Sequence, residues 1–269
     1  MVDIIREHIL SILKSNRRID GRNFDEYRKC TVEYGVSKGA EGSARVVLGE
    51  TEIIAGIKME VNKPFPDTPN EGGIMINVEL RPLSNPDFEL GPPSFDAIEI
   101  SRVVDRAIRE GHAIDFKKLC IKEGELSWMI IIDVYPMNDA GNLIDAASLA
   151  SLAALQDAKF PKLEKDNVVN YKESSGKKLQ LKSMPLCCTV VKLSDCLLLD
   201  PGLDEENNFD SKLTVGVLED GTICSMQKGG EIGLTSEEID SMIEIAIKKT
   251  KEIRKVLAKW TLQNMKKQD

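Results

Sequence analysis

The fold is decided by a stretch that begins at Ser94 and reads SFDAIEISRVVDRAIRE (94–110), then LSWMIIIDVY (126–135), then DAASLASLAALQDA (145–158). In the first segment apolar side chains recur at about 100° per residue, which predicts an amphipathic helix over residues 96–110. The second segment is almost continuously apolar, as expected of a central strand that is covered on both faces. The third has no charge between its two aspartates and is expected to be a helix buried on nearly all sides.

In each half of the chain, predicted strands are followed by predicted helices. Apolar patterns predict strands over residues 44–48, 52–61, 74–80, 186–192, 196–200, 213–218 and 222–227. Helices are predicted over residues 2–14 and from a capping box at Thr235 and Glu238 to near the end of the chain. This order is typical of the α+β class, with two similar strand-plus-helix halves. We expect one compact unit that comprises an N-terminal helix and arm (1–30), a first half (31–165) and a second half (185–262), with polar residues 171–182 at the boundary.

Composition limits the possible functions. The net charge of −8 excludes a chain that binds nucleic acid through an overall positive charge, so an anionic partner requires a local cluster of basic residues. No apolar run reaches the roughly 20 residues that span a bilayer, and we expect a cytoplasmic protein with no membrane partner. The six cysteines form no CxxC motif and no Cys/His ligand spacing, so we predict no metal site and expect a reducing compartment.

The helix at 96–110 carries three arginines on the side opposite its apolar face. Arg102, Arg106 and Arg109 fall within a stripe of roughly 60°. Guanidinium groups match phosphate oxygens, so the stripe is a candidate phosphate-binding surface. The alternative is an ordinary solvated face on which Asp105 pairs with Arg109 and Arg102. The sequence leaves both interpretations open.

Three other motifs have two interpretations each. The acidic cluster Asp200, Asp204, Glu205, Glu206 and Asp210 suggests either a Mg²⁺ or general-acid site, or a solvated turn at the surface. The charged loop 17–22 reads as a solvated linker whose acids and arginines pair with each other. The run 228–233 is rich in glycine but matches no phosphate-loop motif, which favours a tight connection.

Four motifs in register give the chain a family resemblance. RIDGR (18–22), FELGPP (88–93), DAGNLIDAA (139–147) and QKGG (227–230) occur in that order over essentially the whole chain. In this combination the sequence resembles the RNase PH family, and more narrowly the non-catalytic RNase PH-like subunit of the archaeal exosome. The resemblance implies a ring of three heterodimers in which this chain alternates with a catalytic paralogue. Such a ring, with RNA-binding cap proteins, degrades single-stranded RNA from the 3′ end by phosphate attack.

The sequence departs from the active members of that family at two places. Active members bind inorganic phosphate with a Gly, a Ser or Thr, and an Arg at a helix N-terminus; here Gly141-Asn142-Leu143 provides neither the hydroxyl nor the cation. They also carry two aspartates separated by five residues, whereas only three residues separate Glu206 from Asp210 here. We therefore expect a catalytically inactive subunit without a cofactor. Its candidate RNA-binding residues are Arg102, Arg106 and Arg109.

Three rival functions remain at this point. A self-sufficient phosphorolytic exoribonuclease or nucleotidyltransferase would need the phosphate pocket that the sequence lacks. A pure scaffold would use the same fold without RNA contacts. A dinucleotide-binding module would have to be built on Gly229–Gly233.

Overall fold

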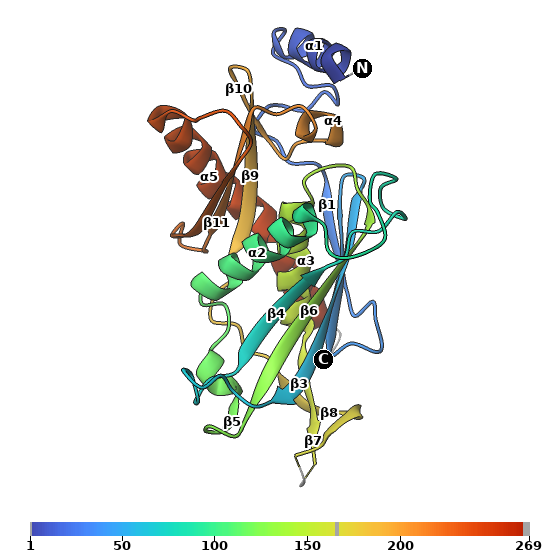
Figure 1. Ribbon diagram of the computed structural model, residues 1–269, viewed down its shortest axis with the longest axis vertical. Helices are drawn as coiled ribbons and strands as arrows, with labels where there is room; N and C mark the ends of the chain where they lie inside the picture. The colour runs from blue at the N-terminus through green and yellow to red at the C-terminus, as the bar shows by residue number, and fades with distance from the viewer. Residues whose placement is uncertain (1, 165–166, 266–269) are drawn as a thin grey trace.

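The computed structural model describes residues 2–164 and 167–265, and its largest element is a six-stranded sheet (Figure 1). Its strands are β1 (Cys30–Tyr34), β2 (Gly42–Leu48), β3 (Thr51–Asn62), β4 (Gly73–Val78), β5 (Cys120–Lys122) and β6 (Leu126–Asn138). They are ordered β1-β2-β3-β6-β4, and β5 also pairs with β6. The long central pair β3 and β6 is antiparallel, whereas β4 runs parallel to β6 at the sheet edge. The predicted central strand is therefore confirmed and is three residues longer at its C-terminal end. The expectation that both its faces are covered is wrong, because buried residues of β6 alternate with half-buried or exposed ones.

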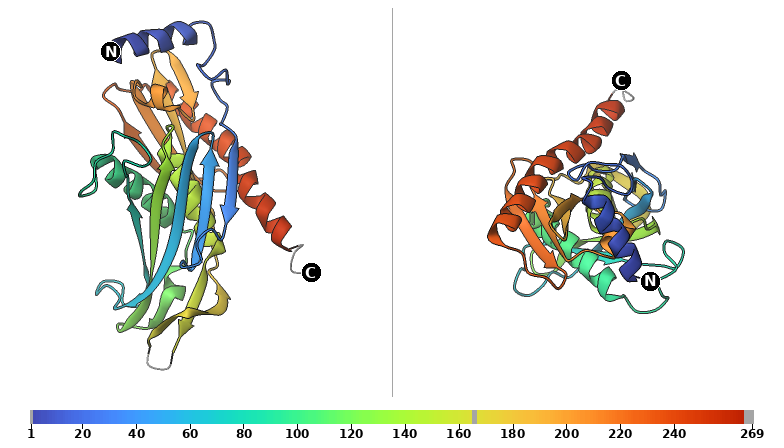
Figure 2. Two further views of the ribbon diagram at one scale, coloured as in Figure 1. Left: turned by 90° about the vertical axis from the view of Figure 1, so that its right-hand side faces the viewer. Right: turned by 90° about the horizontal axis from the view of Figure 1, so that it is seen from above.

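A second, four-stranded sheet is built by the C-terminal half of the chain. Its antiparallel strands are β9 (Leu186–Leu193), β10 (Cys196–Leu199), β11 (Ser211–Val217) and β12 (Ile223–Gly229), in the order β10-β9-β11-β12. Two helices, α2 (Phe95–Glu110) and α3 (Leu143–Asp157), lie between the two sheets (Figure 1). The long helix α5 (Ser236–Met265) covers the other face of the smaller sheet (Figure 2). The predicted α+β class is confirmed.

Helix α3 is the centre of the molecule. Every residue from Leu143 to Leu155 is buried, as predicted from a sequence that is rich in alanine and has no charge between Asp145 and Asp157. Small residues let β2 and the helix approach closely: a Cβ on Gly42 of β2 would lie 2.5 Å from the Ala154 carbonyl oxygen. On the other side, the backbone N–H of Cys187 in β9 donates to Ser148 Oγ at 3.0 Å. One helix therefore contributes to the packing of both sheets.

The N-terminal helix α1 (Val2–Leu13) packs on the end of the smaller sheet. Ile9 and Leu13 are buried against Val191, Leu193 and Leu198 of β9 and β10. The short helix α4 (Leu203–Glu206) follows β10, and a 3₁₀ turn, η1 (Phe116–Leu119), precedes β5. None of the described helices is both long and apolar enough to cross a membrane.

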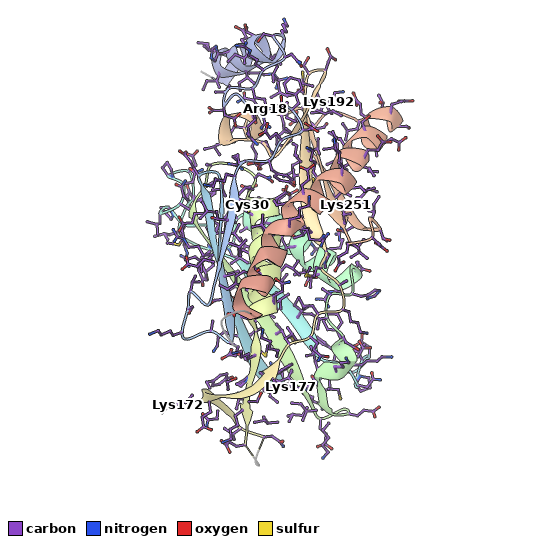
Figure 3. The ribbon with its side chains drawn as sticks, turned by 180° about the vertical axis from the view of Figure 1, so that it is seen from behind. Arg18, Cys30, Lys172, Lys177, Lys192 and Lys251 are labelled. Carbon is purple, nitrogen blue, oxygen red and sulfur yellow. The ribbon has the colours of Figure 1, made fainter. Side chains whose placement is uncertain are left out.

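The polar segment 171–182, which is expected at the boundary between the halves, lies mostly in a strand that the sequence did not predict. Strand β8 (Val169–Lys178) pairs with β7 (Lys159–Leu163) in a two-stranded ribbon at the end of the molecule opposite α1 (Figure 1). Figure 3 shows Lys172 and Lys177 of this ribbon towards the end of the molecule opposite Arg18. Most of β8 is exposed, so its sequence lacks the alternation that identifies a half-buried strand. Residue 165, the expected end of the first half, lies outside the described residues.

Candidate functional site

The N-terminus of α3 holds a carboxylate of the chain itself. Asn142 precedes the helix in the left-handed conformation, with φ of 56°, and its backbone N–H donates to Glu206 Oε2 at 2.6 Å. Burial raises the pKa of Glu206 to about 7. A helix N-terminus binds anions through its free N–H groups and dipole. Here Glu206, at the end of α4, occupies such a position.

The Asn142 side chain joins two further buried carboxylates. Its Nδ2 donates to Asp200 Oδ1 at 2.7 Å and to Asp145 Oδ2 at 3.0 Å. Asp145 also accepts hydrogen bonds from the backbone N–H and the hydroxyl of Thr189, at 3.0 and 2.8 Å. Burial nevertheless raises the pKa of Asp145 to about 6. For Asp200 burial acts in the same direction, but the hydrogen bonds and charge of Arg28 hold its pKa below the usual range.

Arginines from the N-terminal arm balance this acidic cluster. Arg18 is 2% exposed and pairs with Glu205 of α4 through Nη2 and Nε, at 2.5 and 2.9 Å. Figure 3 shows Arg18 close to the end of the molecule that carries α1. Arg22 and Arg28 both contact Asp200, at 3.0 and 2.8 Å. These pairs hold the arm onto the second sheet.

Two expectations are corrected by these contacts. Asp200 and Glu205 form neither a solvated turn nor an open metal site, because both are buried and paired: Glu205 with the buried Arg18, and Asp200 with the half-buried Arg28. Loop 17–22 is likewise no solvated linker, since Arg18 and Arg22 pair with acids about 180 residues away in the chain. The predicted pairing within the loop is confirmed for Arg22, which also forms an ion pair with Asp20 at 2.6 Å. Only Asp204 of the cluster is well exposed. The RIDGR motif contains two arginines of this network, Arg18 and Arg22. The pattern of charges in the sequence does not show which acidic residues they pair with.

The two acids that match the family's catalytic pair have different partners. Glu206 contacts the α3 N-terminus, whereas Asp210 forms an ion pair with Arg6 of α1 at 2.6 Å and accepts from the backbone N–H of Ser194. Within residues 2–164 and 167–265, no group of three or more His, Cys, Asp or Glu is arranged to hold a metal ion. The backbone here is also tightly packed: a Cβ on Gly141 would lie 2.6 Å from backbone atoms of Gly202 and Leu203.

The three arginines of α2 are all exposed, but they differ in their contacts. Arg109 pairs with Asp105 at 2.8 Å, as one of the two interpretations predicted, and its guanidinium lies 5.6 Å from the centre of the Phe116 ring. Arg106 makes one long contact, 3.5 Å to Gln227 Oε1. Arg102 makes no hydrogen bond or ion pair with any described residue, so the predicted pair with Asp105 does not form. Arg102 and Arg106 therefore keep their donors available for a ligand.

A groove of about 580 Å³ runs beside these arginines. Its other walls include Phe65 from the loop between β3 and β4, Met75 from β4 and Met129 from β6. Nothing in the sequence places Phe65 here, because a proline-rich loop has no periodicity from which a facing partner can be inferred. The structure thus adds an apolar wall to a surface that the sequence identified only by its charge.

Family comparisons agree with this fold. Residues 26–161 match the model of the 3′ exoribonuclease family, domain 1, and residues 183–249 match domain 2 of the same family. The chain belongs to this family, the RNase PH family, and the resemblance stated from four motifs is confirmed.

The relatives narrow the resemblance further. The chain is 43% identical over 256 residues to the exosome complex component Rrp42 of Methanopyrus kandleri, covering 94% of this chain and 96% of the relative. It also matches a chain of the Archaeoglobus fulgidus exosome with RNA bound to the active site, at 40% identity and a TM-score of 0.89, covering 94% of this chain and 98% of that one. Rice Rrp46, at 17% identity and a TM-score of 0.67, shows the fold alone.

Proposed function

We propose that this chain is a non-catalytic subunit of an exosome, a ring that degrades RNA from its 3′ end by phosphorolysis. Relatives that match over nearly their full length carry the name exosome complex component Rrp42. One observation carries the non-catalytic role: Glu206 occupies the anion position at the α3 N-terminus, where active members of the family bind phosphate. The Glu206 side chain fills that position, and at pH values above its pKa of about 7 its charge would also repel a second anion.

The proposed partners are a catalytic RNase PH-like paralogue, RNA-binding cap proteins and single-stranded RNA. Three heterodimers would alternate around a closed ring, and closure requires two different interfaces on each chain. Six free cysteines are compatible with assembly in the cytoplasm, where thiols stay reduced.

Within the ring, Arg102 and Arg106 would contact RNA phosphates beside the active site of the partner. The two residues lie one helical turn apart and face the groove together. Phosphate contacts position RNA without reading its sequence. Arg109 is the third candidate, and it is paired with Asp105. A chain of net charge −8 can serve RNA in this way because the basic surface is local.

Two measurements test the proposed assembly and the absence of catalysis. The pure chain, incubated with inorganic phosphate and oligoadenylate, is expected to release no nucleoside diphosphates. Co-expression with a catalytic paralogue is expected to yield a species with the mass of three heterodimers. Release of nucleoside diphosphates by the chain alone would establish the self-sufficient enzyme instead.

Charge reversal tests the arginines. In the assembled ring, Arg102→Glu combined with Arg106→Glu is expected to weaken oligoadenylate binding about tenfold or more, and to lower the salt dependence by about one counterion for each phosphate that is no longer bound. Equilibrium binding without inorganic phosphate, over a range of salt concentrations, gives both quantities. The charge-matched control is Lys14→Glu with Arg17→Glu, which reverses two exposed cations after α1. Normal assembly with unchanged binding and degradation would favour a pure scaffold.

A further inference from the structure

Phe65 is a large apolar side chain exposed next to the arginine groove. It is 62% exposed, although it lines the same groove as Arg102 and Arg106. Burying a phenylalanine side chain is favourable, so a ring left in water beside two available cations is a candidate ligand contact.

The loop that carries Phe65 is held in place by backbone hydrogen bonds. The N–H of Thr68 donates to the Phe65 carbonyl oxygen at 3.1 Å, and the N–H of Gly72 donates to the carbonyl of Phe116 at 2.9 Å. The N–H of Gly124 donates to the Pro69 carbonyl at 2.7 Å, and Pro64 is buried. A ring presented from an anchored loop loses little conformational freedom when a ligand packs against it.

Methionines extend the apolar surface from the loop towards the sheet. Met75 on β4 is 50% exposed, and Met129 on β6 lies over Gly73, whose Cβ position would be 2.7 Å from Met129 Cε. The groove also contains three carboxylates. Asp105 is paired with Arg109, which leaves Glu71 and Glu110 opposite two arginines that have no acidic partner among the described residues. The groove therefore combines an aromatic and thioether wall with available guanidinium groups.

We infer that this groove binds an unpaired segment of single-stranded RNA, with phosphates on Arg102 and Arg106 and a base stacked on the Phe65 ring. The inference rests on the proposed function and adds a base contact to it. Single-stranded nucleic acid is bound by cationic surfaces combined with aromatic side chains, and stacking tolerates any base. Phe65 is then a positioning residue that acts on the base, whereas the arginines act on the backbone.

Binding by two probes separates stacking from charge. In the ring assembled with a catalytic paralogue, without inorganic phosphate, Phe65→Ala is expected to weaken binding of oligoadenylate by about fivefold or more. The same variant is expected to bind an abasic oligomer of equal length as wild type does, because that probe has phosphates but no bases. Phe65→Trp is expected to restore oligoadenylate binding, and Phe65→Leu is not. Phe95→Ala is the matched control, since Phe95 is 92% exposed but does not line the groove.

Each failure has a distinct meaning. Unchanged oligoadenylate binding by Phe65→Ala, with the Arg102/Arg106 variant still impaired, would overturn the stacking contact and leave the proposed function standing. If Phe65→Ala weakened binding of oligoadenylate and of the abasic oligomer equally, or if Phe65→Leu restored oligoadenylate binding, Phe65 would have a structural role. Either result would also overturn the stacking contact. Loss of ring assembly in Phe65→Ala would make the groove a protein interface instead. If Phe65→Ala weakens oligoadenylate binding but the Arg102/Arg106 variant binds as wild type does, the phosphate contacts of the proposed function would be contradicted.

Discussion

Glu206 accepts a hydrogen bond from the backbone N–H of Asn142 at the start of α3. This hydrogen bond stabilises the ionised carboxylate, whereas burial destabilises it. The helix dipole and the donor favour the ionised form, yet removal from water outweighs them and raises the pKa to about 7. A group of this kind holds its proton in the folded chain at a pH where the unfolded chain has released it. Its presence therefore makes stability depend on pH near neutrality.

Glu206→Gln is expected to remove that dependence. Between the ordinary value of 4.5 and about 7 the folded wild type holds one proton more than the unfolded chain, so its free energy of unfolding falls as pH rises through this range. Relative to the variant, wild type should lose about 1 to 3 kcal/mol between pH 5 and pH 8. Urea unfolding at both pH values measures the difference. The exposed Glu244→Gln is the control, and parallel pH profiles of Glu206→Gln and wild type would contradict the argument.

Single residues of the site were only partly predictable from sequence. The sequence shows directly that Asn142 and Leu143 lack the hydroxyl and guanidinium groups that active family members have at these positions. The carboxylate that fills their place could not be predicted, because Glu206 lies 64 residues further along the chain. Phe65 was missed for the same reason: its role depends on which helix faces its loop, and that is a tertiary contact.

At the scale of elements, helix α5 begins as its sequence predicts. The N–H of Glu238 donates to Thr235 Oγ1 at 3.2 Å, and the N–H of Thr235 donates to Glu238 Oε2 at 3.0 Å, which completes a capping box. The hydrogen bonds of a capping box join residues three positions apart and need no tertiary partner, so a capping box can be predicted from the sequence. Strand β8 could not be predicted in this way. It pairs with β7 in an exposed ribbon, so its sequence has no alternation of apolar and polar residues.

Thr235→Ala is expected to destabilise the chain by about 1 kcal/mol, since it leaves the N–H of Glu238 without its acceptor. Chemical denaturation measures the loss, and Thr235→Ser should recover most of it. Ser241→Ala is the matched control: its hydroxyl donates to the Glu237 carbonyl on the exposed side of the same helix, and its removal should cost less than about 0.5 kcal/mol. Equal losses at both positions would show that the cap does not stabilise α5.

At the scale of the whole molecule, α3 joins the two sheets into one core. Its apolar residues pack with β2 and β3, while Ser148 and Asp145 hydrogen-bond to β9. The sequence predicted this burial from the absence of charge between Asp145 and Asp157. It predicted the order of the strands and helices that it identified, but it missed β1, β5, β7 and β8. It did not predict that β4 forms an edge parallel to β6, because pairing partners far apart in the chain are not encoded in local periodicity.

Because the sheets share α3, the chain is expected to unfold in one cooperative transition. Calorimetry should give a van't Hoff enthalpy equal to the calorimetric one. Native-state hydrogen exchange should give similar opening free energies for the central amides of β3 and β11. Two resolved thermal transitions, or protection of β3 that outlasts that of β11 by several kcal/mol, would show that the halves fold independently.

The carboxylate at the start of α3 has a consequence for evolutionary reversal. Restoring serine at position 142 and arginine at position 143 would return the missing ligands of a phosphate but leave Glu206 in its place. A lineage carrying those two replacements would still have Glu206 in the anion position and the shortened spacing to Asp210, so it would gain no phosphorolytic activity for selection to reward. The inactive state of this subunit is thereby protected against simple back-mutation.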